Sequence, residues 1–458
     1  MAQSQETLQY AGEYEILDST LTSSTGITIN ISKLITEINL FEDIFSNAIS
    51  GSIILIDTNN LVSKAPLIGQ ERVKLKLAIP TVTSGEAAIE ITFFVYKIVM
   101  NTEVSKNAQM IELAMVTPEL LRNFRIRVSK SYTNTIDNIV QDILQNDETL
   151  IGTKKDVFID KTSGIRRMVV PNLRPYDIIK NLATEAVSDT GQPYFFFYET
   201  LKGLNFTSLE TLYRELPVAE YESSDFSVVP GPNKPYTNGQ SVTGDLEKDY
   251  KRTLSYSMSA YNDMLANTVS GMLGSNIIRY DMYYKTYQKK QFGYFSNFND
   301  NARTDGNPIY NDNDLKDSPD ARIHLQPGFS KNNDTSHYNT NTNEYGFSGS
   351  RIYETLLSRQ SKFSELTMGA SAMITVHGNF SLNVGKSVNF KMPGVGDTEY
   401  DEALSGKYII TTLRHTFNNP QKKSQTIMTL VKDSTSAPFL DVGSPEAGVP
   451  STTYEGSY

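Results

Sequence analysis

The chain of 458 residues contains the stretch Leu67-Ile68-Gly69-Gln70-Glu71-Arg72-Val73-Lys74-Leu75-Lys76-Leu77-Ala78-Ile79-Pro80. A similar stretch near the other end reads Asn383-Val384-Gly385-Lys386-Ser387-Val388-Asn389-Phe390-Lys391-Met392-Pro393. In each, a glycine precedes an alternating, lysine-bearing run and a proline follows it. Alternation of apolar and polar residues is typical of a half-buried β-strand. The two stretches therefore predict two related strands, one in each half of the chain.

The similarity continues beyond these strands. A further strand follows each stretch, at 93–99 and 408–413, and each series closes with Gln-x-Ile, at Gln109 and Gln425. The distance from the glycine to that glutamine is 40 residues in both copies. Ile49-Ser50-Gly51 and Val376-His377-Gly378 form a third pair that precedes both stretches. Any two β-hairpins share such features, but three ordered matches with a common spacing favour a duplicated β-barrel module.

A helical pattern separates the two copies. Ile136, Ile139, Val140, Ile143 and Leu144 fall at the spacing of one apolar helix face. A second helix is expected to begin near Pro175, because proline is tolerated in the first turn, and to bury Ile178, Ile179, Leu182 and Ala186. The Phe-rich run 194–198 and the run 204–206 predict a hairpin whose turn contains Gly203.

Two later segments are polar. Residues 296–350 hold 11 Asn and 7 Asp, so a long surface loop, partly disordered, is expected there. Residues from Ser434 onward are rich in Ser, Pro, Gly and Thr and predict an extended tail that docks on a partner rather than on its own domain. Residues 251–295 are rich in aromatic side chains and give no firm prediction.

Composition excludes several classes of protein. The chain has no cysteine, so disulfides, thiolate metal sites and cysteine nucleophiles are absent. Only four histidines occur, and the formal net charge of −10 argues against a general nucleic-acid binder. Neither a secretory signal nor an apolar run long enough for a membrane span is visible.

The order of the motifs resembles one family. Phe41-Glu42-Asp43-Ile44-Phe45, Ile49 to Ile53 with Asp57, and Leu67 to Glu71 resemble the N-terminal tube module of the baseplate central hub protein of contractile-tailed bacteriophages. The second tube module is similar to Val376-His377-Gly378, Val384-Gly385, and Ser405 to Ile410 with His415. Pro175 to Leu182 and the Phe-rich hairpin match the insert of this family and of type VI secretion spike hubs. The likeness covers about 40–210 and 350–432.

The resemblance implies a β-rich α+β fold with two tail-tube-like antiparallel β-barrel modules, a small helical insert and long loops. The expected organisation is a first barrel over 1–122, a helical insert over 123–192, a hairpin and aromatic-rich region over 193–295, an Asn/Asp-rich loop over 296–350, a second barrel over 351–433 and a tail over 434–458.

The resemblance also implies a structural virion protein and no enzyme. Such a hub is a homotrimer in the tail baseplate that joins the six-fold tail tube to the three-fold spike and leaves a channel for DNA. The implied partners are further copies of the chain, the tail tube protein, the spike or tail lysozyme, the wedge proteins, and DNA in transit. Assembly would take place in the host cytoplasm. An acidic channel would repel the phosphates of DNA. The net charge of −10 is equally explained by the ordinary need for solubility.

Candidate chemical sites are few, and no catalytic, cofactor-binding or metal-binding residue is predicted. The acidic loop with Asp312, Asp314, Asp317 and Asp320 lacks the order of a calcium loop and favours a solvated loop. His377 and His415 are expected as structural residues on paired strands. A basic cluster comprises Arg122, Arg125, Arg127 and Lys130, and it favours a protein interface over DNA contact.

An alternative function is a carbohydrate-binding or cell-wall-degrading tail protein. Glycosidases need only two positioned carboxylic acids, and acids are plentiful. Exposed tyrosines also serve as sugar platforms, and the candidates are Tyr280, Tyr283, Tyr284, Tyr287 and Tyr294. Tyrosines at this spacing are more typical of a core or an interface.

Overall fold

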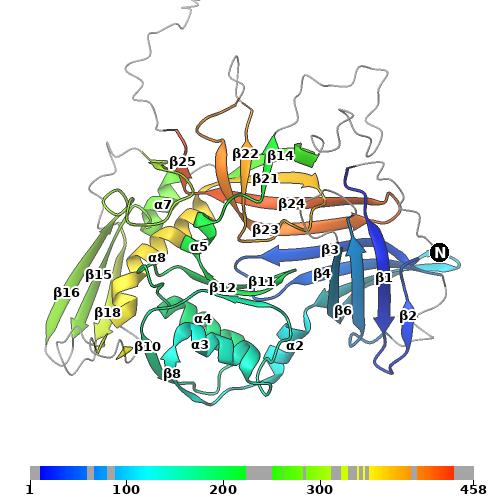
Figure 1. Cartoon of the computed structure of the whole chain (residues 1–458), viewed down its shortest axis with the longest axis horizontal. Coiled ribbons are helices and arrows are strands. Elements are labelled where there is room, and N and C mark those ends of the chain that lie inside the picture. Colours follow the sequence, from blue (N-terminus) through cyan, green and yellow to red (C-terminus); the bar gives the residue numbers. More distant parts are fainter. Residues whose placement is uncertain are drawn as a thin grey trace, which may run out of the picture.

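The chain is described from a computed structural model (Figure 1). The structure describes residues 11–58, 67–79, 88–222, 250–260, 263–281, 285–310, 321–328, 338–339, 344–345, 350–393 and 400–437. These residues form the expected β-rich α+β fold, in which a large and mostly antiparallel sheet carries a helix-containing insert. Among the described residues, no helix combines the length and the apolar character needed to cross a lipid bilayer.

The first module contains seven antiparallel strands. In order of pairing they run β3-β4-β7-β6-β5-β1-β2. Their bounds are β1 Glu15–Thr22, β2 Thr28–Asn30, β3 Ile35–Asp43, β4 Ser50–Asp57, β5 Arg72–Ala78, β6 Ala88–Ser105 and β7 Ala108–Val116. As the alternation predicts, β5 buries Val73, Leu75 and Leu77 while Arg72 and Lys74 stay exposed.

The second module is built from the far part of the chain. Its strands are β13 Ala219–Glu222, β14 Ser255–Ala260, β21 Ala370–His377, β22 Ser387–Lys391, β23 Gly406–Asn418 and β24 Lys423–Lys432. They pair in the order β14-β21-β24-β23-β22-β13, and the β13–β22 pair is parallel. A second apolar core fills this module, separate from the core of the first.

The two modules share one strand order, as the sequence repeat predicts. The order β4-β7-β6-β5 in the first corresponds to β21-β24-β23-β22 in the second, with antiparallel neighbours throughout. The matching glycines adopt the same left-handed conformation, with φ of +85° at Gly69 and +83° at Gly385. Few residues other than glycine adopt this conformation without strain.

One detail of the repeat is wrong. Ile49-Ser50-Gly51 and Val376-His377-Gly378 lie on the expected strands, but in a different register. Gln109 pairs with Asp57 and Gln425 pairs with His377, so Asp57, rather than Ser50, corresponds to His377. A three-residue match around a glycine does not specify register, because a strand shows the same alternation at every second position.

The two modules are joined edge to edge into one continuous sheet. β3 pairs antiparallel with β23, from Thr412 opposite Asp43 to Asn418 opposite Glu37. The result is a 13-stranded sheet that runs through both modules. In Figure 1, β3 and β4 lie directly beside β23 and β24 at the centre of the molecule. The sequence did not indicate this pairing.

The insert forms a third core beside the sheet. Its elements are α2 Pro118–Arg125, β8 Ser131–Thr135, α3 Ile136–Gln141, the π-helix η1 Asp142–Asn146, β9 Val157–Ile159, β10 Ile165–Val169, α4 Pro175–Glu185, β11 Phe195–Thr200, β12 Gly203–Ser208 and α5 Leu209–Arg214. The predicted apolar stripes of α3, η1 and α4 are buried, and Pro175 is the first residue of α4. The hairpin β11–β12 contributes to the same core, so α4 and β11 are packed together across the expected boundary at 192–193.

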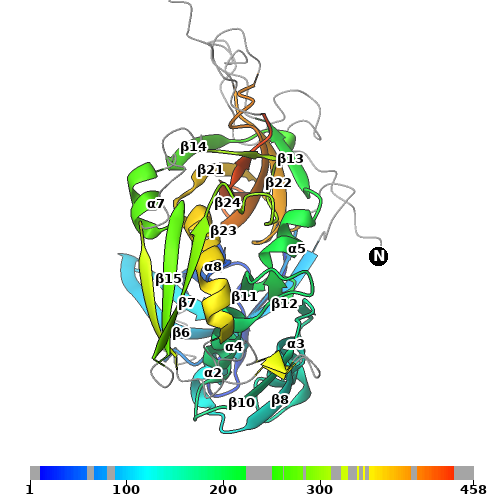
Figure 2. The same ribbon diagram turned by 90° about the vertical axis from the view of Figure 1, so that its left-hand side faces the viewer.

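A long helix supports a separate small sheet. This outlying layer contains α7 Met264–Ser270, β15 Gly274–Asp281, β16 Thr286–Gly293, β18 Ile323–Gly328 and α8 Ser350–Met368. Short strands from the same part of the chain pair elsewhere: β19 Tyr338–Asn339 pairs with β20 Glu344–Tyr345, which extends the insert sheet at β10, and β17 Asn307–Pro308 pairs with β25 Ser434–Thr435. Three strands pair in the order β16-β15-β18, and Ile277 and Phe292 pack against Leu357 of α8. Figure 2 shows this sheet lying along α8.

Two expectations about polar segments need correction. Residues 296–310 lie in the expected surface loop, yet Phe298 and Thr304 are buried there. The expected free tail begins with β25, which is buried and pairs with β17. Both segments are anchored by polar contacts rather than by aliphatic side chains, so their composition did not indicate burial. The rest of the expected tail, residues 438–458, lies outside the described residues.

The matched glycines share a conformation but differ in their surroundings, and alanine substitution tests this difference. Gly69→Ala adds a Cβ that meets no atom within 3.4 Å, so it should cost only about 1 kcal/mol of left-handed strain. Gly385→Ala adds a Cβ that runs into the Tyr198 hydroxyl, and we expect a loss of about 2 to 4 kcal/mol. Urea unfolding of the two variants measures the difference. Equal losses would contradict the close contact at Gly385.

Candidate functional site

A buried carboxylate holds three parts of the chain together. Glu42, on β3, is 2% exposed. Its Oε1 accepts a hydrogen bond from the backbone N–H of Leu201 at 2.8 Å, and its Oε2 accepts one from Val384 at 3.0 Å. Leu201 lies in the turn between β11 and β12, and Val384 lies just before β22. Glu42 therefore ties the first module to the insert and to the second module.

A second buried carboxylate makes the reciprocal contact. Glu199, on β11, accepts hydrogen bonds from the N–H of Ile49 at 3.1 Å and the hydroxyl of Thr117 at 2.6 Å. Its other oxygen lies 2.6 Å from Nζ of Lys155, which is also 2.7 Å from Glu119. Glu199 therefore binds the hairpin of the insert to β4 and to the end of β7. We call Glu42 and Glu199 the junction carboxylates.

Burial controls the protonation of these groups. The pKa of Glu42 is raised to about 7, mainly by burial and in part by the nearby Glu199 carboxylate, while its two backbone donors and Lys202 oppose the shift. Burial also raises the pKa of Glu199, and Lys155 opposes that shift. Burial by itself lowers the pKa of Lys155, but Glu199 and Glu119 outweigh it and raise that pKa. Glu42 thus has no cation in contact, whereas Glu199 has one.

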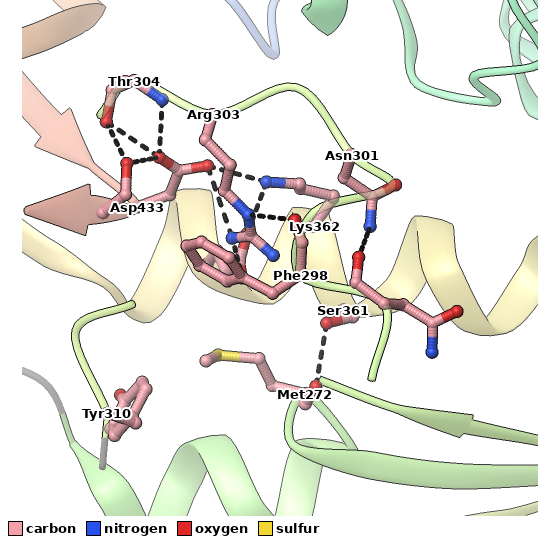
Figure 3. A network of polar contacts seen from close by, with 12 residues as sticks. Met272, Phe298, Asn301, Arg303, Thr304, Tyr310, Ser361, Lys362 and Asp433 are labelled. Atoms are coloured by element: carbon pink, nitrogen blue, oxygen red, sulfur yellow. Dashed lines mark hydrogen bonds and ion pairs between the residues drawn. The ribbon is translucent and has the colours of Figure 1, made fainter. Parts of the chain in front are cut away.

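A network of four buried charges forms the second polar centre (Figure 3). Arg303 Nη1 lies 2.6 Å from Glu365 Oε1, and Lys362 Nζ lies 2.7 Å from Asp433 Oδ2. Two longer contacts close the network, at 3.0 Å between Lys362 and Glu365 and at 3.6 Å between Arg303 and Asp433. All four side chains are at most 7% exposed. Two positive and two negative charges are thereby balanced inside the protein.

Asp433 connects this network to the backbone. Its Oδ1 accepts hydrogen bonds from the N–H of Thr304 at 3.0 Å and the hydroxyls of Thr304 and Ser434. Burial alone would raise the pKa of Asp433, but Lys362 and Arg303 hold it well below its usual range. The guanidinium of Arg303 also lies over the ring of Phe298, 4.1 Å from its centroid. These contacts fix the segment 298–305 against α8 and the end of β24.

The two histidines named in the sequence analysis lie on strands of the second module. His377 and His415 lie on β21 and β23, and each is paired with β24, opposite Gln425 and Thr426. Burial lowers the pKa of His415 to about 3, so its ring is neutral, and Nδ1 lies 3.0 Å from the Thr426 hydroxyl. Within the described ranges, no group of three or more His, Cys, Asp or Glu has metal-binding geometry. The acidic loop with Asp312, Asp314, Asp317 and Asp320 lies outside those ranges.

The basic cluster is split by its local contacts. Lys130 forms ion pairs with Asp142 and Asp147 at 2.8 and 3.5 Å. Arg122 donates a hydrogen bond to the carbonyl of Glu148, and Arg127 donates one to that of Asn172 at 3.5 Å. The three arginines of the cluster remain together at the start of the insert, while Lys130 belongs to a separate acidic pair.

The tyrosines proposed as a sugar platform do not form one surface. Tyr294 is 1% exposed and packs among aromatic rings of the outlying layer. Tyr280 and Tyr287 are exposed and face each other across β15 and β16. Tyr283 and Tyr284 lie outside the described residues. Of the three candidates within the described residues, Tyr280 and Tyr287 form one exposed pair and Tyr294 lies in a core.

Sequence reasoning missed the residues that form the two polar centres. Glu42 stood within the quoted motif Phe41 to Phe45, but its position on an alternating strand gave no sign of burial. Glu199 follows five aromatic residues in the hairpin, and that apolar context was the available signal. Lys362 and Glu365 form an i,i+3 pair on α8, which by its spacing reads as an ordinary surface pair. Their contacts with Arg303 and Asp433 had no local signal, because 62 residues separate Arg303 from Glu365 and 71 separate Lys362 from Asp433.

Solved structures with a similar fold exist, but no similar sequence was found among family models or curated proteins. No protein-family model and no curated protein matches the chain. Among solved structures, the 43 kDa tail protein of prophage MuSo2 from Shewanella oneidensis is similar at a TM-score of 0.51 and 10% identity, over 91% of this chain and 98% of that one. The chain thus shares the fold of a phage tail protein.

Two further solved structures are similar at lower scores. The tail protein from Neisseria meningitidis MC58 has a TM-score of 0.48 and 10% identity, over 92% of this chain and 97% of that one. The prophage tail protein gp18 from Listeria monocytogenes EGD-e has a TM-score of 0.45 and 9% identity, over 92% and 95%.

We predict that the stability of the protein falls as the pH rises through about 7. The pKa of Glu42 is raised on folding, so the folded state binds its proton more tightly, and this contribution is complete below about pH 4.5. Ionisation at higher pH should cost at most about 3 kcal/mol. Urea unfolding from pH 5 to pH 8.5 measures this loss. In Glu42→Gln the difference in unfolding free energy between pH 5 and pH 8.5 should shrink, whereas the control Glu15→Gln, at an exposed glutamate of β1, should retain it. An unchanged pH dependence in Glu42→Gln would refute the assignment.

We further predict that Asp433→Ala is strongly destabilising. Its removal leaves Arg303 and Lys362 buried with only Glu365 for compensation, which should cost about 3 to 5 kcal/mol. Hydrogen exchange should accelerate at the amide of Thr304, which loses its acceptor. The exposed Asp300, replaced by Ala, serves as the control and should leave both quantities unchanged. Full protection of the Thr304 amide in Asp433→Ala would contradict the role of this carboxylate as the anchor of the segment.

Proposed function

We propose that the chain is the structural hub of a contractile phage tail baseplate. In this role three copies form a ring that joins a six-fold tail tube to a three-fold spike. The observation that carries the proposal is the duplication: two modules with one strand order, β4-β7-β6-β5 and β21-β24-β23-β22, lie in a single sheet. The fold shared with the Shewanella prophage tail protein supports the same reading.

Symmetry explains why a duplicated module suits this role. A closed trimer with two similar modules per chain presents six similar modules around its axis. Such a ring offers nearly equivalent contacts to each of six tube subunits on one face, while its true three-fold symmetry is retained for a spike on the other. A chain with one module would need six copies to match the tube and would then mismatch the spike.

The rigid joint between the modules supports the proposal. The seven residue pairs of β3 and β23, from Asp43 with Thr412 to Glu37 with Asn418, fix the two modules relative to each other. Glu42 reinforces the joint, because its carboxylate binds both the insert and the loop that precedes β22. An adaptor between two symmetries needs its modules at a constant angle, and a shared sheet provides this better than a flexible linker does.

The proposal includes partners and location. The tail tube protein would bind one face of the ring, the spike or tail lysozyme protein the other, and wedge proteins the periphery. DNA would pass through the central channel without being bound, in keeping with the net charge of −10. The protein would be assembled in the host cytoplasm and act within the virion tail. The role is structural and includes no enzymatic step.

Oligomeric state and symmetry test the proposal directly. We expect the purified chain to form a particle of three times the chain mass by mass photometry, alone or with a spike protein. Projections by negative-stain electron microscopy should show a three-fold ring with a central hole. A monomer at every concentration, both alone and with the spike, would refute the hub. Binding or cleavage of glycans by such a monomer would favour the alternative function.

A further inference from the structure

An exposed surface of α2 combines arginines with apolar side chains. α2 connects the first module to the insert and lies at their boundary in Figure 1. Its inner face is fixed by the buried Asn123, whose side chain accepts a hydrogen bond from the backbone N–H of Tyr176 at 2.8 Å. On the outer face, Phe124 is 53% exposed and Leu121 is 37% exposed. Arg125 lies one turn from Leu121 and therefore shares this face.

One further arginine contacts the exposed ring, and two others lie beside this face in the sequence. The guanidinium of Arg174 lies over the Phe124 ring, 4.8 Å from its centroid. Arg122 and Arg127 are held in place by backbone carbonyl groups. We call this set the α2 surface, and its members are Leu121, Arg122, Phe124, Arg125, Arg127 and Arg174. Its charges thus belong to side chains that are positioned by local contacts rather than extended freely into solvent.

The arginines of the α2 surface lack carboxylate partners. In the parts of the chain that the structure describes, none of the four forms an ion pair. Two lysines of the insert, in contrast, do form ion pairs. Lys130 pairs with Asp142, and Lys155 pairs with Glu119 and Glu199. Among the described residues, four arginines on or next to α2 are therefore without an ion pair, and one of them, Arg174, stacks on the exposed ring of Phe124.

This composition is typical of the centre of a protein–protein interface. Arginine and aromatic residues are enriched among the side chains that dominate binding energy, especially when they stack on each other. A nucleic-acid site would depend on a broad excess of positive charge. The insert provides no such excess, because residues 118–192 contain 11 Lys and Arg beside 10 Asp and Glu. The α2 surface therefore favours an acidic protein surface over DNA.

Charge also determines how copies of the chain could meet. A two-fold contact would place the same four arginines against each other, which like-charge repulsion disfavours. A head-to-tail contact would place them against a different and acidic surface of the next copy. Outside residues 118–192 the chain has 31 Lys and Arg against 42 Asp and Glu, so acidic groups are in excess there. Head-to-tail contacts generate a closed ring when the rotation between neighbouring copies closes, which is the case in the proposed trimer.

We infer that the α2 surface binds an acidic face of the neighbouring copy in the ring. This inference rests on the proposed trimer and adds to it one of the surfaces that hold it together. Phe124 and Leu121 provide the apolar anchor, and the arginines select carboxylates. The contact is heterologous, because it joins two different surfaces. Each copy binds one neighbour through its α2 surface and is bound by the other neighbour's α2 surface on its acidic face.

Charge reversal tests the contact on the full chain. In Arg125→Glu we expect the dissociation constant of the trimer to rise at least tenfold, and in Phe124→Ser we expect a similar weakening. Lys180, exposed on α4 of the same insert, provides the matched control, and Lys180→Glu should leave association unchanged. Unchanged circular dichroism and thermal unfolding show that each variant is folded. Raising NaCl from about 0.15 M to about 0.5 M should weaken the wild type more than Arg125→Glu, because salt screens exposed charges.

A cross-link identifies the partner surface. Arg125→Lys keeps the charge and provides an amine that a carbodiimide joins to a carboxylate in contact with it. In a mixture of isotope-labelled and unlabelled chains, mass spectrometry should find Lys at position 125 linked to an Asp or Glu of a different copy. Links confined to one chain, together with a trimer of unchanged stability in Arg125→Glu, would overturn this contact and leave the hub intact. A monomeric wild type would overturn both proposals. Binding of a 20-nucleotide single-stranded DNA that is lost in Arg125→Glu would assign the surface to nucleic acid instead.

Discussion

The pairing of β3 with β23 is the constraint on which the rest of the structure depends. Without it, β3 and the second half of β23, residues 412–418, would each present a row of unpaired backbone groups, because β22 covers only residues 406–409 of β23. In the chain, β3 is hydrogen-bonded to β4 on one side and to β23 on the other, so both edges are consumed within the molecule. The same pairing brings Glu42, opposite Leu413, to the place where the insert and the second module meet the first. Backbone hydrogen bonds between β3 and β23 thus join the modules, and the side chain of Glu42 adds two further hydrogen bonds at the same place.

Polar groups hold the attached segments because those segments have few aliphatic residues. The segment 298–305 reaches the protein interior through Arg303 and Thr304, and the chain after β24 does so through Asp433 and Ser434. A buried ion is tolerated only when a partner and hydrogen bonds replace its hydration. The equal number of positive and negative groups in this network meets that condition. Such a network contributes little net stability compared with an apolar core, but it specifies one arrangement, since a shifted segment would leave a charge unpaired.

The sequence predicted what local pattern determines. Alternation located β5 and β22, the helical stripe located α3 and α4, and the repeat established that both halves share one topology. Features that depend on contacts between distant residues were missed. The β3–β23 joint unites residues that are 369 or more apart, and either strand alone reads as an ordinary half-buried strand. The burial of Glu42 depends on Leu201 and Val384, and that of Asp433 depends on Lys362 and Arg303. Their side-chain type, considered alone, predicts exposure.

The perturbed carboxylates have a structural explanation, which bears on the proposed function. A raised pKa in a glutamate is a common sign of a catalytic acid, because active sites shift the pKa values of their groups. Glu42 has such a raised pKa, but the arrangement of its hydrogen bonds is that of a structural residue. Both of its oxygens accept hydrogen bonds from backbone amides of other parts of the chain, and its side chain is 2% exposed. Glu199 is likewise occupied by Ile49, Thr117 and Lys155. The cost of burying these charges is therefore tied to the joints between modules, which is where a protein with a geometrical role would require fixed contacts.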